Sequence, residues 1–201
     1  MIEVRAKKKL DEFILNAKLK DEGIICLIGS NGSGKTTLLN LIAGVITPDD
    51  GYVRINSADI TRVPQEKRDV VLVTPDSAIP NFDVEKHLVF GAKLKKLPVK
   101  QDRIDEVKAG LGVQFSGRVS KLSLGMKERV ALATALIANP KVILVDEAFS
   151  NIDSKSEFIE NYSKLAASSK IDVLYSTQHA DDSAHADHVY RIEHGLTFRE
   201  R

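Results

Sequence analysis

Gly29-Ser30-Asn31-Gly32-Ser33-Gly34-Lys35-Thr36 is the stretch that decides the fold, because it matches the pattern G-x-x-x-x-G-K-[ST] at every position. The glycines allow backbone torsions that turn successive N–H groups toward phosphates. Lys35 can reach the β- and γ-phosphates, and the Thr36 hydroxyl is a ligand type that Mg²⁺ accepts. We therefore expect residues 29–37, Thr37 included, to bind the phosphates of a nucleotide together with Mg²⁺.

The segments on either side of this loop support the same interpretation. Residues 24–28 form a short, fully apolar run that is typical of a buried parallel strand. Residues 36–43 have helical spacing, and Gly44 is a suitable residue to end that helix. Further strands are predicted within 1–20 and at 52–55, 70–73, 142–145, 173–175 and 189–192, the last of these being the final strand.

Helical periodicity is concentrated in the middle of the chain. Apolar residues recur at three- and four-residue steps in 84–96, 101–111 and 124–138, and again in 155–168. The order of strands, helices and then alternating strands and helices predicts an α/β fold with a mixed β core and N-terminal antiparallel strands. We expect one domain over 1–201, with a core of 1–77 and 139–201 and an inserted helical subdomain at 78–138.

Two carboxylates follow the predicted strand at 142–145. A carboxylate at the end of a buried strand is costly unless a cation or hydrogen-bond donors accompany it. Asp146 therefore fits a ligand of Mg²⁺, direct or through water. The side chain of Glu147, one residue further on, is expected to point in a different direction from that of Asp146, and it suits a general base that polarises an attacking water.

Composition excludes several other classes of protein. The net charge is +1, with 29 basic and 28 acidic residues, so nucleic acid is not indicated as the main partner. The single cysteine, Cys26, excludes a disulfide within the chain and suits a reducing compartment, where we expect it to be a small core residue. No apolar run approaches the ~18 residues of a spanning helix, so any membrane role requires a partner.

The segment Leu122-Ser123-Leu124-Gly125-Met126-Lys127-Glu128-Arg129 resembles the signature motif of the ATP-binding cassette (ABC) ATPases, usually written LSGGQ. Ser123 is also a good N-cap for a helix that follows it. The resemblance implies a P-loop ABC-ATPase fold. It further implies that Ser123, Leu124 and Gly125 face the γ-phosphate of ATP held by a second subunit, which suits a helix N-terminus.

Other segments resemble the same family. Ser150-Asn151-Ile152-Asp153 is similar to its D-loop, which contacts the partner subunit. Phe13 is either the aromatic residue that stacks on adenine or a core phenylalanine. Thr74 stands where the family has a glutamine, and we expect it near Mg²⁺ although its side chain is shorter.

The position of the family's catalytic histidine has two candidates. Alignment on Thr177 puts Gln178 there, and a shift of one residue puts His179 there. Both side chains have a donor for a γ-phosphate. The simpler alignment favours Gln178; hydrolysis is expected, and its rate stays open at this stage.

The resemblance implies an ATPase that powers transport through a separate integral membrane permease. It acts as a homodimer or with a paralogous subunit, at the cytoplasmic side of the cell membrane, and it touches the membrane only through its partner. The cofactors are ATP and Mg²⁺. The alternatives are a non-transport ABC-type ATPase and a nucleotide-binding regulator with little turnover. Cargo and direction of transport stay open at this stage.

Overall fold

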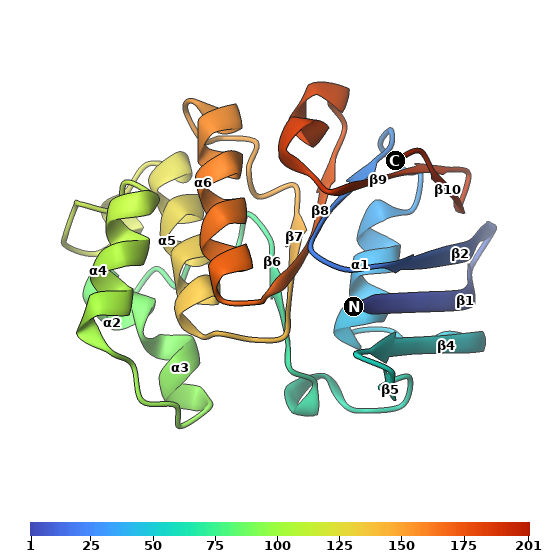
Figure 1. Cartoon of the computed structure of the whole chain (residues 1–201), viewed down its shortest axis with the longest axis horizontal. Helices are drawn as coiled ribbons and strands as arrows, with labels where there is room; N and C mark the ends of the chain where they lie inside the picture. The colour runs from blue at the N-terminus through green and yellow to red at the C-terminus, as the bar shows by residue number, and fades with distance from the viewer.

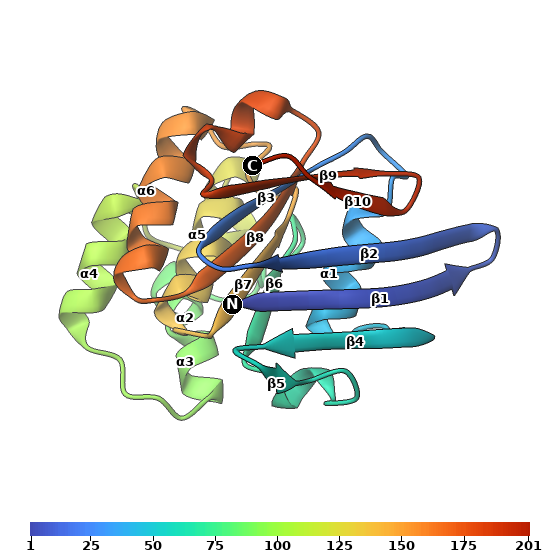
Figure 2. The same cartoon turned by 45° about the vertical axis from the view of Figure 1, so that its right-hand side comes forward.

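A ten-stranded sheet runs through the computed structural model, which describes residues 1–201 (Figure 1). The strand order is β5-β4-β1-β2-β10-β9-β3-β8-β7-β6. In Figures 1 and 2 the N-terminal strands lie on one side of the molecule and α2 to α6 lie on the other, with β6, β7 and β8 between them. None of the helices combines the length and the apolar character that a bilayer span requires.

The N-terminal strands are antiparallel, as predicted. They are β1 (Ile2–Leu10), β2 (Phe13–Asp21), β4 (Asp50–Ile55) and the short β5 (Ala58–Asp59). β1 lies between β2 and β4 and pairs antiparallel with both. Burial alternates along these strands, so that one row of side chains enters the core and the other faces outward.

The half of the sheet from β9 to the edge strand β6 is parallel, and β3 and β7 within it are buried along their whole length. Its strands are β3 (Ile24–Ile28), β6 (Val70–Val73), β7 (Val142–Asp146), β8 (Asp172–Thr177) and β9 (His188–Glu193). β3 shows why these runs are continuously apolar: Cys26 packs into one hydrophobic cluster, and Leu27 packs into the cluster on the other face. Burial raises the pKa of the Cys26 thiol to about 12, which confirms a core residue.

Helix α1 (Lys35–Ala43) packs between the N-terminal strands and the parallel strands, since its hydrophobic cluster contains residues of β1, β2 and β4 as well as of β3 and β7. Arg68, just after the 3-10 turn η1 (Gln65–Lys67), holds its carboxyl end. The Arg68 guanidinium donates to the carbonyls of Leu41 and Ile42 at 3.0 and 2.7 Å. A Cβ at Gly44 would lie 2.5 Å from Arg68 Nε, so glycine is required for this close approach.

The chain between β6 and β7 is helical. It forms α2 (Val84–Leu88), α3 (Phe90–Leu94), α4 (Gln101–Gly110), the turn η2 (Val119–Lys121) and α5 (Leu124–Ile137). After β7 come α6 (Lys155–Ser168) and η3 (Ala180–His185). All helices from α2 to α5 lie within 78–138, but one hydrophobic cluster joins α2, α4 and α5 to β7 and β8. The predicted division at 78 and 138 remains a prediction.

The periodic stretch 84–96 is helical as predicted, with an interruption at Val89, where φ is −95° and ψ is −1°, that divides it into α2 and α3. One expectation about the elements was wrong. The strand at 189–192 is not the last, because β10 (Leu196–Arg199) returns beside β9. His194 and Gly195 make the tight turn between them, both with positive φ.

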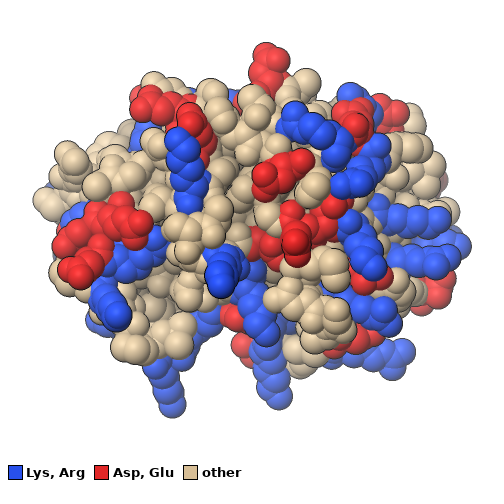
Figure 3. Space-filling model, viewed as in Figure 1, with Lys and Arg blue, Asp and Glu red and all other residues tan.

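Charge is unevenly distributed over the surface. Side chains of Lys and Arg gather over β1, β2 and β4 in Figure 3. Arg5, Lys18 and Arg54 lie on the outward row of these strands, with Arg5 paired directly opposite Lys18. Although the numbers of basic and acidic residues are nearly equal, the protein therefore has a basic face over β1, β2 and β4.

Candidate nucleotide-binding site

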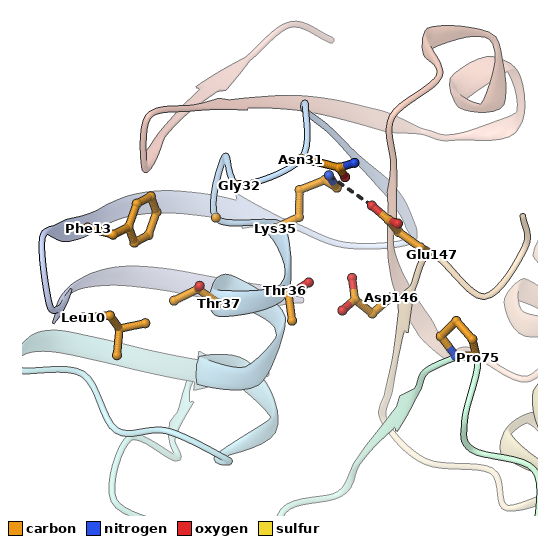
Figure 4. Close-up of a pocket in the computed structure, with 11 residues that line it drawn as sticks. Leu10, Phe13, Asn31, Gly32, Lys35, Thr36, Thr37, Pro75, Asp146 and Glu147 are labelled. Carbon is orange, nitrogen blue, oxygen red and sulfur yellow. Dashed lines mark ion pairs between the residues drawn. The ribbon is translucent and has the colours of Figure 1, made fainter.

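A pocket of about 520 Å³ lies where the phosphate loop, the end of β7 and the β1–β2 hairpin meet (Figure 4). It brings together side chains from four separate parts of the sequence. Its lining residues are Leu10, Phe13, Asn31, Gly32, Gly34, Lys35, Thr36, Thr37, Pro75, Asp146 and Glu147.

The phosphate loop has the local geometry that the sequence predicts. Gly34 has a φ of 110°, in the left-handed region that glycine tolerates. A Cβ at Gly34 would lie 2.7 Å from Phe13 Cζ, so the ring of Phe13 sits directly against the loop. Helix α1 begins at Lys35, and its N-terminus thus opens into the pocket, where an anion is favoured.

Lys35 is held at the bottom of the loop with only 5% of its surface exposed. Its Nζ atom donates to the carbonyls of Gly29 and Ser30 at 2.8 and 3.1 Å. The same Nζ lies 3.1 Å from Glu147 Oε1, the ion pair drawn as a dashed line in Figure 4. A γ-phosphate that binds here competes with Glu147 for the charge of Lys35.

Ser176 fixes the two carboxylates at the end of β7. Its hydroxyl donates to Asp146 Oδ1 at 2.7 Å and accepts from the N–H of Glu147 at 3.1 Å. Glu147 has a φ of 54°, which turns its side chain away from that of Asp146. One hydroxyl thus orients both acids, and sequence reasoning missed it. The available signal was the pair of polar residues, Ser176 and Thr177, that closes the otherwise apolar run of β8.

Mg²⁺ fits the oxygen atoms on one side of the pocket. The Thr36 hydroxyl and the Asp146 carboxylate point toward one another in Figure 4. Both are hard oxygen donors, and Mg²⁺ commonly takes one or two protein ligands beside phosphate oxygens and water.

Thr74 lies in a turn of its own. Its N–H donates to Ser77 Oγ at 2.8 Å, and the two hydroxyls are 3.2 Å apart. Pro75, the next residue, lines the pocket and Thr74 does not. The expectation that Thr74 approaches Mg²⁺ remains a prediction.

Gln178 and His179 are placed differently relative to Glu147. Gln178 Nε2 lies 3.4 Å from each carboxylate oxygen of Glu147. His179 contributes its backbone N–H to Thr177 Oγ1, and its side chain makes no hydrogen bond. Both residues border a small second hollow beside Glu147. This geometry supports Gln178 as the γ-phosphate contact, and the assignment stays a prediction.

The signature segment lies outside both hollows. Ser123 is the N-cap of α5, as predicted, and its hydroxyl accepts from the N–H of Met126 at 3.3 Å. Leu124 is 48% exposed. Ser123, Leu124 and Gly125 do not line the pocket of their own chain, and their contact with ATP of a second subunit stays a prediction.

Glu128 is the other residue that sequence reasoning did not single out. It is 1% exposed, and its two oxygens accept from the backbone N–H and the side-chain amide of Asn151 at 3.1 and 2.7 Å. These bonds join the beginning of α5 to the turn after β7.

The sheet, the phosphate loop and the acids at the end of β7 define a P-loop nucleotide-binding protein. Solved structures support the ABC cassette form of this fold. A dimeric bacterial ABC transporter cassette aligns with a TM-score of 0.83 at 23% identity, over 100% of this chain and 99% of that one. A cassette bound to ADP and Pi aligns with a TM-score of 0.82 at 22% identity, over 100% and 98%. At these identities the likeness shows the fold.

Sequence comparisons identify the family. A family model described as ABC transporter matches residues 14–150. A molybdate/tungstate import ATP-binding protein of Archaeoglobus fulgidus is 37% identical over 78% of this chain and 67% of its own length. A molybdenum import ATP-binding protein of Haemophilus influenzae is 31% identical over 98% and 59%. A spermidine/putrescine import ATP-binding protein of Bacteroides thetaiotaomicron is 41% identical over 74% and 33%. The chain belongs to the ABC transporter family, and it spans about one third to two thirds of these relatives.

Proposed function

We propose that this chain is the ATP-binding and ATP-hydrolysing subunit of an ABC transporter, and that it powers transport through a separate membrane subunit. The observation that carries the proposal is the pocket that joins Lys35 and Thr36 to Asp146 and Glu147. In the proposed reaction Lys35 binds the β- and γ-phosphates, Glu147 polarises the attacking water, and Gln178 orients the γ-phosphate. Thr36 and Asp146 would hold Mg²⁺, which would supply positive charge next to the phosphates.

The pocket also supports a composite site made by two chains. Phe13 and Leu10 provide an apolar wall at its outer end, against which a nucleotide base can stack. No signature residue lines it, so we propose that Ser123–Gly125 of a second copy, or of a paralogue, closes over the γ-phosphate. The chain would then act at the cytoplasmic face of the cell membrane, bound to its permease.

Import is the direction that we propose, because the relatives compared above are import proteins. Their cargoes differ, from molybdate and tungstate to spermidine and putrescine. We therefore propose no particular cargo.

Loss of the Lys35 cation tests the nucleotide site. Lys35→Ala should weaken binding of MgATP by roughly tenfold to a hundredfold, since hydrogen bonds to charged groups contribute about 1.5–3 kcal/mol. Titration calorimetry measures the affinity, and Lys7→Ala on the outward row of β1 is the matched control. A folded Lys35→Ala variant that binds MgATP with the affinity of the wild type would contradict the proposal.

A further inference from the structure

Glu128 is an unusual residue for a hydrophobic cluster. It is 1% exposed, and no ion pair includes it. Burial raises the pKa of its carboxyl, while the hydrogen bonds from Asn151 act in the opposite direction. A buried carboxylate without a cation costs stability unless hydrogen bonds satisfy its oxygens. Glutamine has one acceptor oxygen and an apolar residue has none, so neither could accept both hydrogen bonds from Asn151.

The partner of Glu128 is the turn that follows β7. Both oxygens of Glu128 bind Asn151, one through the backbone N–H and one through the amide. A Cβ at Gly125 would lie only 2.3 Å from the Asn151 carbonyl oxygen, so the backbones of α5 and the turn are in direct contact. Arg129 adds a hydrogen bond to the Asp153 carbonyl at 3.1 Å. The signature segment and the turn therefore pack as one unit.

The same turn begins inside the nucleotide pocket. Its first residue is Glu147, which forms the ion pair with Lys35 at 3.1 Å. The N–H of Ser150 donates to the Glu147 carbonyl at 3.2 Å, and the Ser150 hydroxyl contacts that carbonyl as well. A continuous series of contacts thus leads from Lys35 through Glu147 and Asn151 to the beginning of α5. A γ-phosphate that displaces Glu147 from Lys35 acts on the first member of this series.

We propose that Glu128 is a positioning residue that couples the nucleotide pocket of its own chain to the signature segment that the chain presents to a second copy. Nucleotide bound at one site then sets the position of Ser123–Gly125 at the other site through Glu147, Asn151 and Glu128. The inference rests on the proposed two-chain ATPase. Its direct consequence is cooperativity between the two sites, which depends on one pair of side chains.

Three variants separate this role from packing. Glu128→Ala removes both hydrogen bonds to Asn151. Glu128→Gln keeps the shape but has only one acceptor oxygen, so that its amide must face one of the two Asn151 donors. Asn151→Ala removes the side-chain amide donor of Asn151 and keeps its backbone N–H. Glu106→Ala, an exposed glutamate of α4, is the control for removing a carboxylate from the helical region.

Steady-state ATP turnover is measured against MgATP concentration for each variant, beside its melting temperature. The wild type should show a Hill coefficient above unity. Glu128→Ala should lower kcat by roughly tenfold to a hundredfold and bring the Hill coefficient to unity, with Glu128→Gln in between. The double variant Glu128→Ala/Asn151→Ala should be no worse than Glu128→Ala alone, because the two residues act through the same contact.

Hydrogen exchange provides a measurement that needs no turnover. MgATP should change the exchange rate of the amides at 124–128 in the wild type and leave them unchanged in Glu128→Ala, although both bind nucleotide. The inference would be overturned if the Glu128 variants had a lower melting temperature but unchanged turnover and cooperativity. It would also be overturned if MgATP left the exchange of the signature segment unchanged in the wild type. In either case the ATPase proposal would stand. A wild type that binds no MgATP would remove both.

Discussion

Glu147 has two close neighbours in the pocket region: it forms an ion pair with Lys35 at 3.1 Å, and Gln178 Nε2 lies 3.4 Å from its Oε1. Its positive φ and the hydrogen bond from its N–H to Ser176 hold the backbone while the side chain remains free to turn. A general base must be able to reach its water in the complex, and the ion pair in the free chain does not prevent that.

Substitutions at Gln178 and His179 test which of the two residues contacts the γ-phosphate. Gln178→Ala should lower kcat by roughly tenfold, because one hydrogen bond to a charged group is lost. Gln178→His should retain turnover, since the imidazole also presents an N–H donor. His179→Ala should leave kcat nearly unchanged. The measurement is steady-state phosphate release, and the opposite ranking of the 178 and 179 variants would assign the role to His179.

α2 and α5 are joined through a buried histidine. His87 is 2% exposed; its Nε2 accepts from the N–H of Ile79 at 3.0 Å, and its Nδ1 lies 2.8 Å from the Thr134 hydroxyl. The bond to Ile79 fixes the segment before α2, since only a neutral imidazole can accept it. Burial lowers the pKa of His87 below its ordinary value of 6.5.

The stability of the folded chain should therefore decrease as the pH falls below about 6.5. There the unfolded chain binds a proton at His87 while the folded chain does not, so the free energy of unfolding rises with pH across this window. Each unit of difference between the two pKa values contributes about 1.4 kcal/mol. Urea unfolding of the wild type and of His87→Gln at several pH values measures it. Equal pH dependence in both chains would show that His87 does not titrate as described.

The secondary-structure elements that could be predicted are those whose sequence signal lies within one segment of the chain. The buried strands, α1 and α6 each follow from a run of apolar residues or from helical spacing within one segment. β10 was not predictable, because it is short and mostly exposed, and it is defined by its pairing with β9 and by the Leu196–Asn16 contact with β2. The roles of Ser176 and Glu128 were missed for the same reason, since each depends on a partner more than twenty residues away.

At the scale of the whole molecule, the nucleotide pocket and the signature segment lie at different places on the chain. The sequence predicts both motifs but cannot place one relative to the other. The structure makes the pocket about 520 Å³, without any residue of 122–129 in its lining. In the proposed two-chain site, one chain carries two halves of different sites, and we therefore predict that isolated chains hydrolyse ATP poorly.

The most direct test of this account is the mass of Glu147→Gln in the presence of MgATP, measured by analytical ultracentrifugation. The substitution removes the proposed base and releases Lys35 from its ion pair. We predict a stable dimer with two bound ATP molecules and no turnover, and a return to monomer when ATP is removed. A chain that binds MgATP and stays monomeric at every concentration would contradict the central claim that two copies complete each site.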